Sequence, residues 1–397
     1  NNDPNRPVLI KTHNTIPLFW QYNLDSGVEI LTAAYFPKIF EVNNTRIDRP
    51  TYPAIANFFG KIIGLVLKPL VDLNKLEKTG IGYLIMKILV FSISMILARE
   101  ILINHFNEKI TFLAIFFMYA NAFSIDYFTA FHTSDLQFIT PIFILSIFIY
   151  LIKNYSISKN ILFSIVIGIL MLAKPNYAVY LSIIIFLLYK NKFFEVLISI
   201  TAHLIPIFLY LLFIEYLNYD FAIIGATDFD QGTWSYNDLK DGNFYKVFKL
   251  FFFQIGEFLI RIFSGFQIVI FFSILGFLFK YYKDKIRTDY LLFICIFIIC
   301  TYIQMFVASR FVEYMIKDFS IMVYAFSAYG IYQIVDKFKN NYLKKFFVPF
   351  IMVLYLIFEI ARLVHLPWVH PYDQVSKKAE VLNNKLSELD NDIIIVD

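Results

Sequence analysis

Residues 194–217 read FEVLISITAHLIPIFLYLLFIEYL, a run whose only charged residues are a glutamate near each end. A helix needs about 20 predominantly apolar residues to cross the hydrocarbon core of a bilayer. The run reaches that length, and its apolar residues form a continuous block where a half-buried strand would show alternation. We therefore predict a membrane-spanning helix here.

Similar blocks recur along the chain, in which 59% of residues are hydrophobic and only 17% are charged. The other candidate spans are 80–103, 110–126, 136–152, 161–173, 177–189, 264–282, 289–307, 318–335 and 345–364. Residues 54–72 are either an eleventh span or an interfacial helix. Composition and pattern together predict an all-α polytopic membrane protein, a bundle of about 10–11 helices.

One pair of blocks departs from the pattern. Segments 161–173 and 177–189 are short for a span, and Lys174-Pro175-Asn176 lies between them. Proline removes a backbone donor and ends a helix, so backbone should be exposed at this point. We expect a break here, with the two short helices forming a partial hairpin inside the bundle.

The connecting loops predict the orientation. One alternate set is rich in lysine, which marks the cytoplasmic side; it carries Lys109, Lys153, Lys159, Lys190, Lys192, Lys280, Lys283, Lys285, Arg287, Lys337, Lys339, Lys344 and Lys345. The opposite set has more varied polar residues and isolated cations, and we expect it to be external. It consists of residues 1–79, 127–135, 174–176, 218–262, 308–317 and the tail.

Three regions follow from this arrangement. Residues 1–79 form a first external loop with interfacial helices, and residues 80–366 form the transmembrane bundle. Within the bundle, the external loop 218–262 ends in an amphipathic stretch from Phe244 to Ile262, which is typical of an interfacial helix beside a lipid-entry groove. Residues 367–397 combine a helical pattern with a final strand pattern, so we expect the start of an external α/β soluble segment.

Charge and cysteine content exclude some functions. The formal net charge is +4 and no dense basic run appears, so nucleic-acid binding is not expected. Cys295 and Cys300 lie in one apolar run, where cysteine usually acts as a small apolar side chain. The histidines lack the spacing of zinc ligands. Asp228-Phe229-Asp230 has the form of a divalent-metal site but is a weak candidate, and no metal cofactor is expected.

The first external loop carries the most specific motif. It reads Leu24-Asp25-Ser26-Gly27-Val28-Glu29, then Ala33-Ala34 and, some twenty residues later, Arg49-Pro50-Thr51-Tyr52-Pro53. This combination resembles the glycosyltransferase C (GT-C) superfamily, which includes the dolichyl-phosphate-mannose protein mannosyltransferases and the bacterial aminoarabinose transferases that modify lipid A. In that family a helix precedes the acidic loop, so we expect one ahead of Asn1.

Weaker similarities follow later in the chain. Ala173-Lys174-Pro175 lies where family members place a basic or proline-containing break. Ser309-Arg310-Phe311 with Tyr314 is similar to an Arg-Tyr element of the family, although phenylalanine here follows the arginine. His370-Pro371-Tyr372 is similar to the entry into a soluble C-terminal domain.

The resemblance implies a GT-C-like bundle that transfers a sugar from a polyprenyl-phosphate carrier to an acceptor, which is a lipid, a glycan or a protein. It implies a bacterial inner membrane, with the active site facing the periplasm or exterior. Transfer of this kind needs a carboxylate to take the acceptor's proton and cations to stabilise the leaving phosphate. Asp25 is the candidate base, and Glu29 lies on the same helical face four residues later. Alternatively, Asp25 caps the helix beginning near Gly27 and Glu29 is solvated.

The candidate phosphate-binding residues are the isolated cations Arg49, Lys174 and Arg310, together with the phenol of Tyr52. The guanidinium fork of Arg49 suits a phosphate or a carboxylate, and the prolines beside it could serve only to enter helix 54–72. A cation in mid-membrane costs about 2.5 to 3.5 kcal/mol on insertion scales, so a deep one requires a partner or a wet cavity.

A polar island at His132, Ser134 and Asp135 lines the acceptor site in this hypothesis, although a connecting loop explains it equally well. Two other classes of function stay open. A flippase for lipid-linked saccharides would show internal symmetry between its halves, and a non-catalytic membrane subunit would keep the fold without activity. In both, Asp25 would not act as a base.

Overall fold

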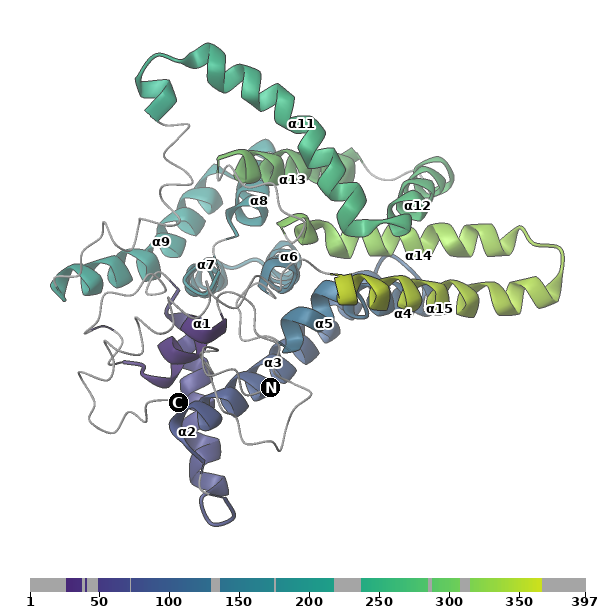
Figure 1. Cartoon of the computed structure of the whole chain (residues 1–397). Helices are drawn as coiled ribbons and strands as arrows, with labels where there is room; N and C mark the ends of the chain where they lie inside the picture. The colour runs from purple at the N-terminus through teal and green to yellow at the C-terminus, as the bar shows by residue number, and fades with distance from the viewer. Residues whose placement is uncertain are drawn as a thin grey trace.

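The computed structural model describes residues 26–37, 40, 49–71, 73–129, 136–174, 176–217, 237–284, 288–307 and 315–365 (Figure 1). This part of the chain is mostly helical and contains no strand. Its elements are α1 (Ser26–Ala34), α2 (Thr51–Leu67), α3 (Lys75–Ile103), α4 (Glu108–Tyr119), α5 (Ala122–Thr129), α6 (Leu136–Lys153), α7 (Ile157–Met171), α8 (Tyr177–Tyr189), α9 (Phe193–Tyr216), α11 (Phe244–Phe266), α12 (Ile268–Asp284), α13 (Thr288–Val307), the 3₁₀ helix η4 (Met315–Phe319), α14 (Ser320–Asp336) and α15 (Asn341–His365).

Within the described residues, α3 and α9 are long and apolar enough to cross a membrane. The pair α11 and α12 would add a third span if counted together, although it is bent by 100°. The predicted helical class is thus confirmed for the described residues, and two to three of their segments could cross a membrane. The number of 10–11 spans stays a prediction, and the predicted α/β segment at 367–397 lies outside the described residues.

Three helix starts illustrate how local sequence determines the boundaries. Asn74 caps α3 in a reciprocal capping box with Glu77, each side chain accepting a backbone N–H at 2.8 Å. Asn107 caps α4 by accepting the Ile110 N–H at 3.0 Å. Pro50 directly precedes α2, whose first turn tolerates proline because its N–H groups lack helical partners.

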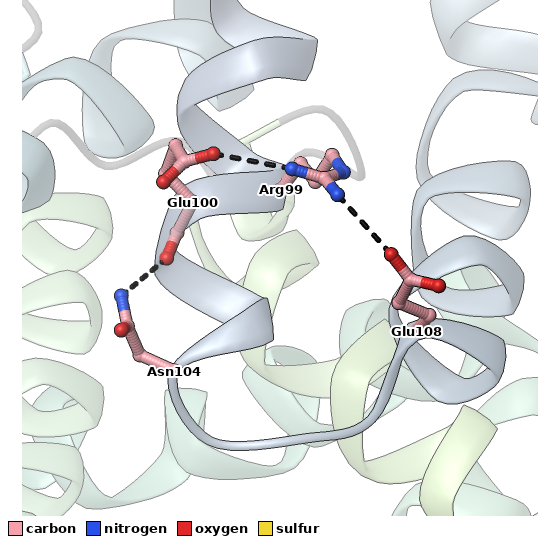
Figure 2. A network of polar contacts seen from close by, with 4 residues as sticks. All are labelled: Arg99, Glu100, Asn104 and Glu108. Carbon is pink, nitrogen blue, oxygen red and sulfur yellow. Dashed lines mark hydrogen bonds and ion pairs between the residues drawn. The ribbon is translucent and has the colours of Figure 1, made fainter.

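Helix α4 follows α3 after a tight turn at residues 104–107, where the chain reverses direction (Figure 2). Arg99 reaches across this turn to Glu108 at 3.4 Å and also contacts Glu100 at 3.2 Å. All three side chains are more than half exposed, and exposed pairs of this kind contribute about 0–1 kcal/mol. The turn is therefore held mainly by its backbone and by the Asn104 amide, which donates to the Glu100 carbonyl at 2.6 Å.

Glycines allow two helix pairs to pack closely. In the hairpin of α2 and α3, a methyl group added at Gly82 would lie 2.5 Å from the Gly60 nitrogen. Between α12 and α14, a methyl group at Gly276 would lie 2.8 Å from the Gly330 nitrogen. Small residues at such crossings are typical of membrane helices, because association there depends on close van der Waals contact.

The sequence run 110–126, predicted as one span, is broken in the structure at Ala120 and Asn121, between α4 and α5. The Asn121 side chain accepts the Ser124 N–H at 3.0 Å and so caps the new helix. The Glu359 carboxylate accepts the Ala122 N–H at 2.8 Å. A carboxylate is favourable at a helix N-terminus, so a distant residue stabilises the break.

The break predicted at Pro175 is confirmed in position, since α7 ends at Met171 and α8 begins at Tyr177. The expected hairpin is not the main packing arrangement: α7 packs mostly against α9, and α8 mostly against α13. A methyl group at Gly168 of α7 would overlap the His203 carbonyl oxygen of α9, which shows how closely these two helices approach.

Helix α11 confirms the predicted amphipathic helix and extends it to Phe266. It runs along the upper edge of Figure 1, and its N-terminal half leaves large apolar side chains exposed, including Phe244, Tyr245 and Phe253. Its contacts with α12, α13 and η4 hold the helix.

Candidate functional site

Four of the predicted site residues are described, and all four are buried. The exposed fractions are 1% for Glu29, 9% for Arg49, 3% for Tyr52 and 8% for Lys174. The reading of Glu29 as a solvated loop residue is therefore wrong. The other candidates lie outside the described residues: Asp25, His132, Asp135, Arg310 and the weak metal candidates Asp228 and Asp230.

Helix α1 begins at Ser26, as predicted, and lies against α2 and α3. The Tyr83 hydroxyl of α3 donates to the Glu29 carbonyl at 3.3 Å, and the Asn57 amide of α2 donates to the Ala33 carbonyl at 2.7 Å. Tyr52 packs edge-to-face on Tyr83 with ring centroids 5.9 Å apart. These contacts hold both parts of the first-loop motif on one face of α3.

The break after α7 belongs to the same region. Ala173 is part of the buried cluster that contains Ile30, Tyr52 and Tyr83. The Thr51 hydroxyl also donates to the Ile169 carbonyl at 3.4 Å, which joins the start of α2 to the end of α7. Lys174 therefore follows directly on a residue packed against the first-loop motif.

On its other side, the break is attached to η4 and α13. The Asn176 amide donates to an Asp318 carboxylate oxygen at 2.7 Å, and both residues are almost completely buried. The Ala178 N–H donates to the Gln304 side chain at 2.6 Å. Asp318 lies eight residues beyond Arg310, so the structure ties the Lys174 break to the element that follows the predicted arginine.

Two buried lysines were missed by the sequence reasoning. Lys87 is 1% exposed and lies one turn beyond Tyr83 on α3. Lys317 is 2% exposed, donates to the Gly265 carbonyl at 2.9 Å and lies 4.7 Å from the ring centre of Phe266. The available signal was a lone lysine inside or beside an apolar run, which marks a functional position by default.

Helix α15 contributes a buried carboxylate, Glu359, and a partly buried cation, Arg362. Glu359 accepts the Ala122 N–H, and Arg362 donates to the same Gly265 carbonyl as Lys317, at 3.0 Å. The Arg362 guanidinium also lies 4.5 Å from the ring centre of Phe123. These contacts hold helix ends together, and cations at a helix C-terminus complement its dipole.

In the described part of the chain, no three His, Cys, Asp or Glu side chains gather closely enough to hold a metal ion. The buried cations and carboxylates come from α1, from Arg49 just before α2, from α3, from the α7–α8 break and from η4. Such a set can bind an anion and hold a proton acceptor beside it.

Comparison with known proteins assigns neither a family nor a function to the chain, so the evidence for its function comes from the contacts and the sequence motifs. No protein-family model matches the chain, and neither a curated protein nor a solved structure is similar to it.

Proposed function

We propose that the protein is a membrane glycosyltransferase of the GT-C type, which moves a sugar from a polyprenyl-phosphate donor to an acceptor on the external face of the membrane. The proposal includes a GT-C-like bundle of 10–11 helices and a bacterial inner-membrane location, with the site facing the periplasm. The acceptor is a lipid, a glycan or a protein.

One observation carries the proposal: the first-loop motif and the Lys174 break, more than 100 residues apart, meet around one buried cluster. Burying a polar residue within an apolar protein costs free energy unless the residue is paired. Such residues often mark a binding or catalytic site. Both segments were selected by sequence resemblance, and a shared site requires them to be neighbours. Their contact therefore supports a shared site.

The reaction assigns a role to each group. An acceptor oxygen forms a bond to the anomeric carbon of the sugar, while the bond from that carbon to the carrier phosphate breaks. The phosphate leaves with the bonding electron pair, and the acceptor proton passes to Asp25. A positioned base contributes about 10² to 10⁴ in rate.

The cations in this proposal stabilise the charge that develops on the leaving phosphate. Lys174 and Arg49 have this role, Arg310 joins them, and Tyr52 orients the site through its contact with Tyr83. Fixed cations in a site shielded from water are more effective than the same charges in solution, because water screens them less. Glu29 orients Asp25 or a sugar hydroxyl.

The experiment is sugar transfer in proteoliposomes, with polyprenyl phosphates bearing different radiolabelled sugars and a membrane extract from the source organism as acceptor. We expect transfer with at least one donor, and a loss of about 10² to 10⁴ in rate for Asp25→Asn. Asp241→Asn is the matched control, because Asp241 is exposed beyond the described site. Lys174→Met should also reduce transfer.

Transfer at the wild-type rate by a folded Asp25→Asn protein would refute the role of Asp25. Movement of a labelled lipid-linked saccharide across the membrane by both proteins, without transfer, would favour the flippase instead.

A further inference from the structure

A separate cavity lies among α6, α7, α8 and α9, with a volume of about 220 Å³. Because a water molecule takes about 30 Å³ in the liquid, this is room for roughly seven waters or an equivalent length of alkyl chain. One wall is apolar and comes from α6 and α8. It consists of Ile144, Ile147, Phe148, Leu151, Ile183, Ile184 and Leu187.

The opposite wall is polar and comes from α7 and α9. Asn160 is 2% exposed; its side-chain oxygen accepts the Ser199 hydroxyl at 2.9 Å, and its amide donates to the Glu195 carbonyl at 3.2 Å. Ser164 also lines this wall. The cavity therefore has an apolar side and a hydrogen-bonding side, which is the character of a site for an amphipathic molecule.

The cavity is elongated along the helices. Tyr180 and Leu187 both line it, and seven residues of helix span roughly 10 Å. Tyr180 stacks on His203, with ring centroids 4.1 Å apart, at the end remote from Lys192. The shape thus suits a chain lying parallel to the helices.

Cations gather at the other end. Lys192 lines the cavity and pairs with Glu195 at 3.3 Å, while its own side chain is 56% exposed. Lys190 lies two residues before it in the sequence, and Lys159, which precedes the cavity residue Asn160, donates to the Tyr150 hydroxyl at 3.3 Å. Lys192 is the lysine among the lining residues, and a lysine at the membrane surface attracts an anionic lipid surface by about 1 kcal/mol.

We propose that the cavity binds one acyl chain of an anionic phospholipid, with its phosphate beside Lys192. The chain lies against the apolar wall of α6 and α8, with the polar wall of α7 and α9 on its other side. The site is independent of the proposed sugar transfer, because none of these residues belongs to the cluster around Tyr52.

Native mass spectrometry of the purified protein tests this, with phosphatidylglycerol and phosphatidylcholine of identical acyl chains added separately. We expect one tightly retained phosphatidylglycerol, and weaker retention of phosphatidylcholine. Ile184→Phe places a larger side chain in the cavity and should weaken retention. Ile185→Phe is the matched control, since Ile185 is the next residue on α8 but is 42% exposed outside the cavity.

Lys192→Gln changes an exposed side chain, so the variant should fold even if Ile184→Phe does not. It should weaken phosphatidylglycerol retention about five-fold, the equivalent of 1 kcal/mol, and weaken phosphatidylcholine retention less, because the choline cation offsets the charge of its phosphate. Equal retention of the two lipids by the wild type, or unaltered phosphatidylglycerol binding in both variants, would overturn the proposal. Displacement of phosphatidylglycerol by polyprenyl phosphate at equal concentration would assign the cavity to the carrier instead.

Discussion

The hydrogen bond between Asn176 and Asp318 joins two parts of the candidate site that are 142 residues apart. At 2.7 Å, with 0% and 1% of the two residues exposed, it is a short bond to a carboxylate out of contact with solvent. Hydrogen bonds to charged groups contribute about 1.5–3 kcal/mol. We therefore expect a coupling free energy of that size between the two side chains.

Both residues make further contacts, so either single substitution removes more than this bond. A double-mutant cycle of Asn176→Ala, Asp318→Ala and the combined variant isolates the pairwise contribution. The free energy of unfolding is measured by reversible unfolding in mixed detergent micelles. Each single variant should be destabilised, and the double variant by less than the sum of the two.

The chain offers a control of the same chemistry. Asn243 donates to Asp238 at 3.5 Å ahead of α11, and Lys246 donates to the same carboxylate oxygen at 2.9 Å. The cycle of Asn243 and Asp238 should give a coupling below about 0.5 kcal/mol, because the bond is long and Lys246 competes for the carboxylate. Additive effects at Asn176 and Asp318, within about 0.5 kcal/mol, would refute the claim that this bond fastens the break to η4.

Two further substitutions test the packing and the capping. Gly276→Leu should destabilise the protein by about 3 kcal/mol relative to the control Gly256→Leu. Both substitutions raise helix propensity, but only Gly276 faces the backbone of another helix. Equal thermal stability of the two variants would contradict this. Glu359→Leu should lower the free energy of unfolding by about 1–3 kcal/mol by leaving the Ala122 N–H without its acceptor. Glu359→Gln keeps an acceptor oxygen and should lose less, so the reverse order would contradict the capping role.

Local sequence was sufficient for most helix positions. The proline at 175 and the apolar block 194–217 predicted a break and a span that the structure contains. Both signals act within a few residues, through a missing backbone donor and through the length of an apolar run. The helix of the first loop was expected to begin near Gly27 from local sequence, and α1 begins at Ser26 in the described residues.

The interruption of 110–126 could not be predicted, because one of the groups that stabilise it is supplied from α15, where Glu359 accepts the Ala122 N–H. Lys87 and Lys317 are a related case: their identity was visible, but their burial depends on helices far away in sequence. The contact between the first-loop motif and the Lys174 break also depends on tertiary packing. The sequence identified the two segments, but it could not show that they are neighbours.

The Gly265 carbonyl, at the end of α11, accepts hydrogen bonds from Lys317 and from Arg362, which belong to η4 and α15. Rotating α11 about the corner at Gln267 would break both bonds, and each bond to a cation contributes about 1.5–3 kcal/mol. These two bonds therefore hold the C-terminal end of α11 in place against η4 and α15. A substrate that approaches the protein from this side would meet α11 held at its C-terminal end by η4 and α15.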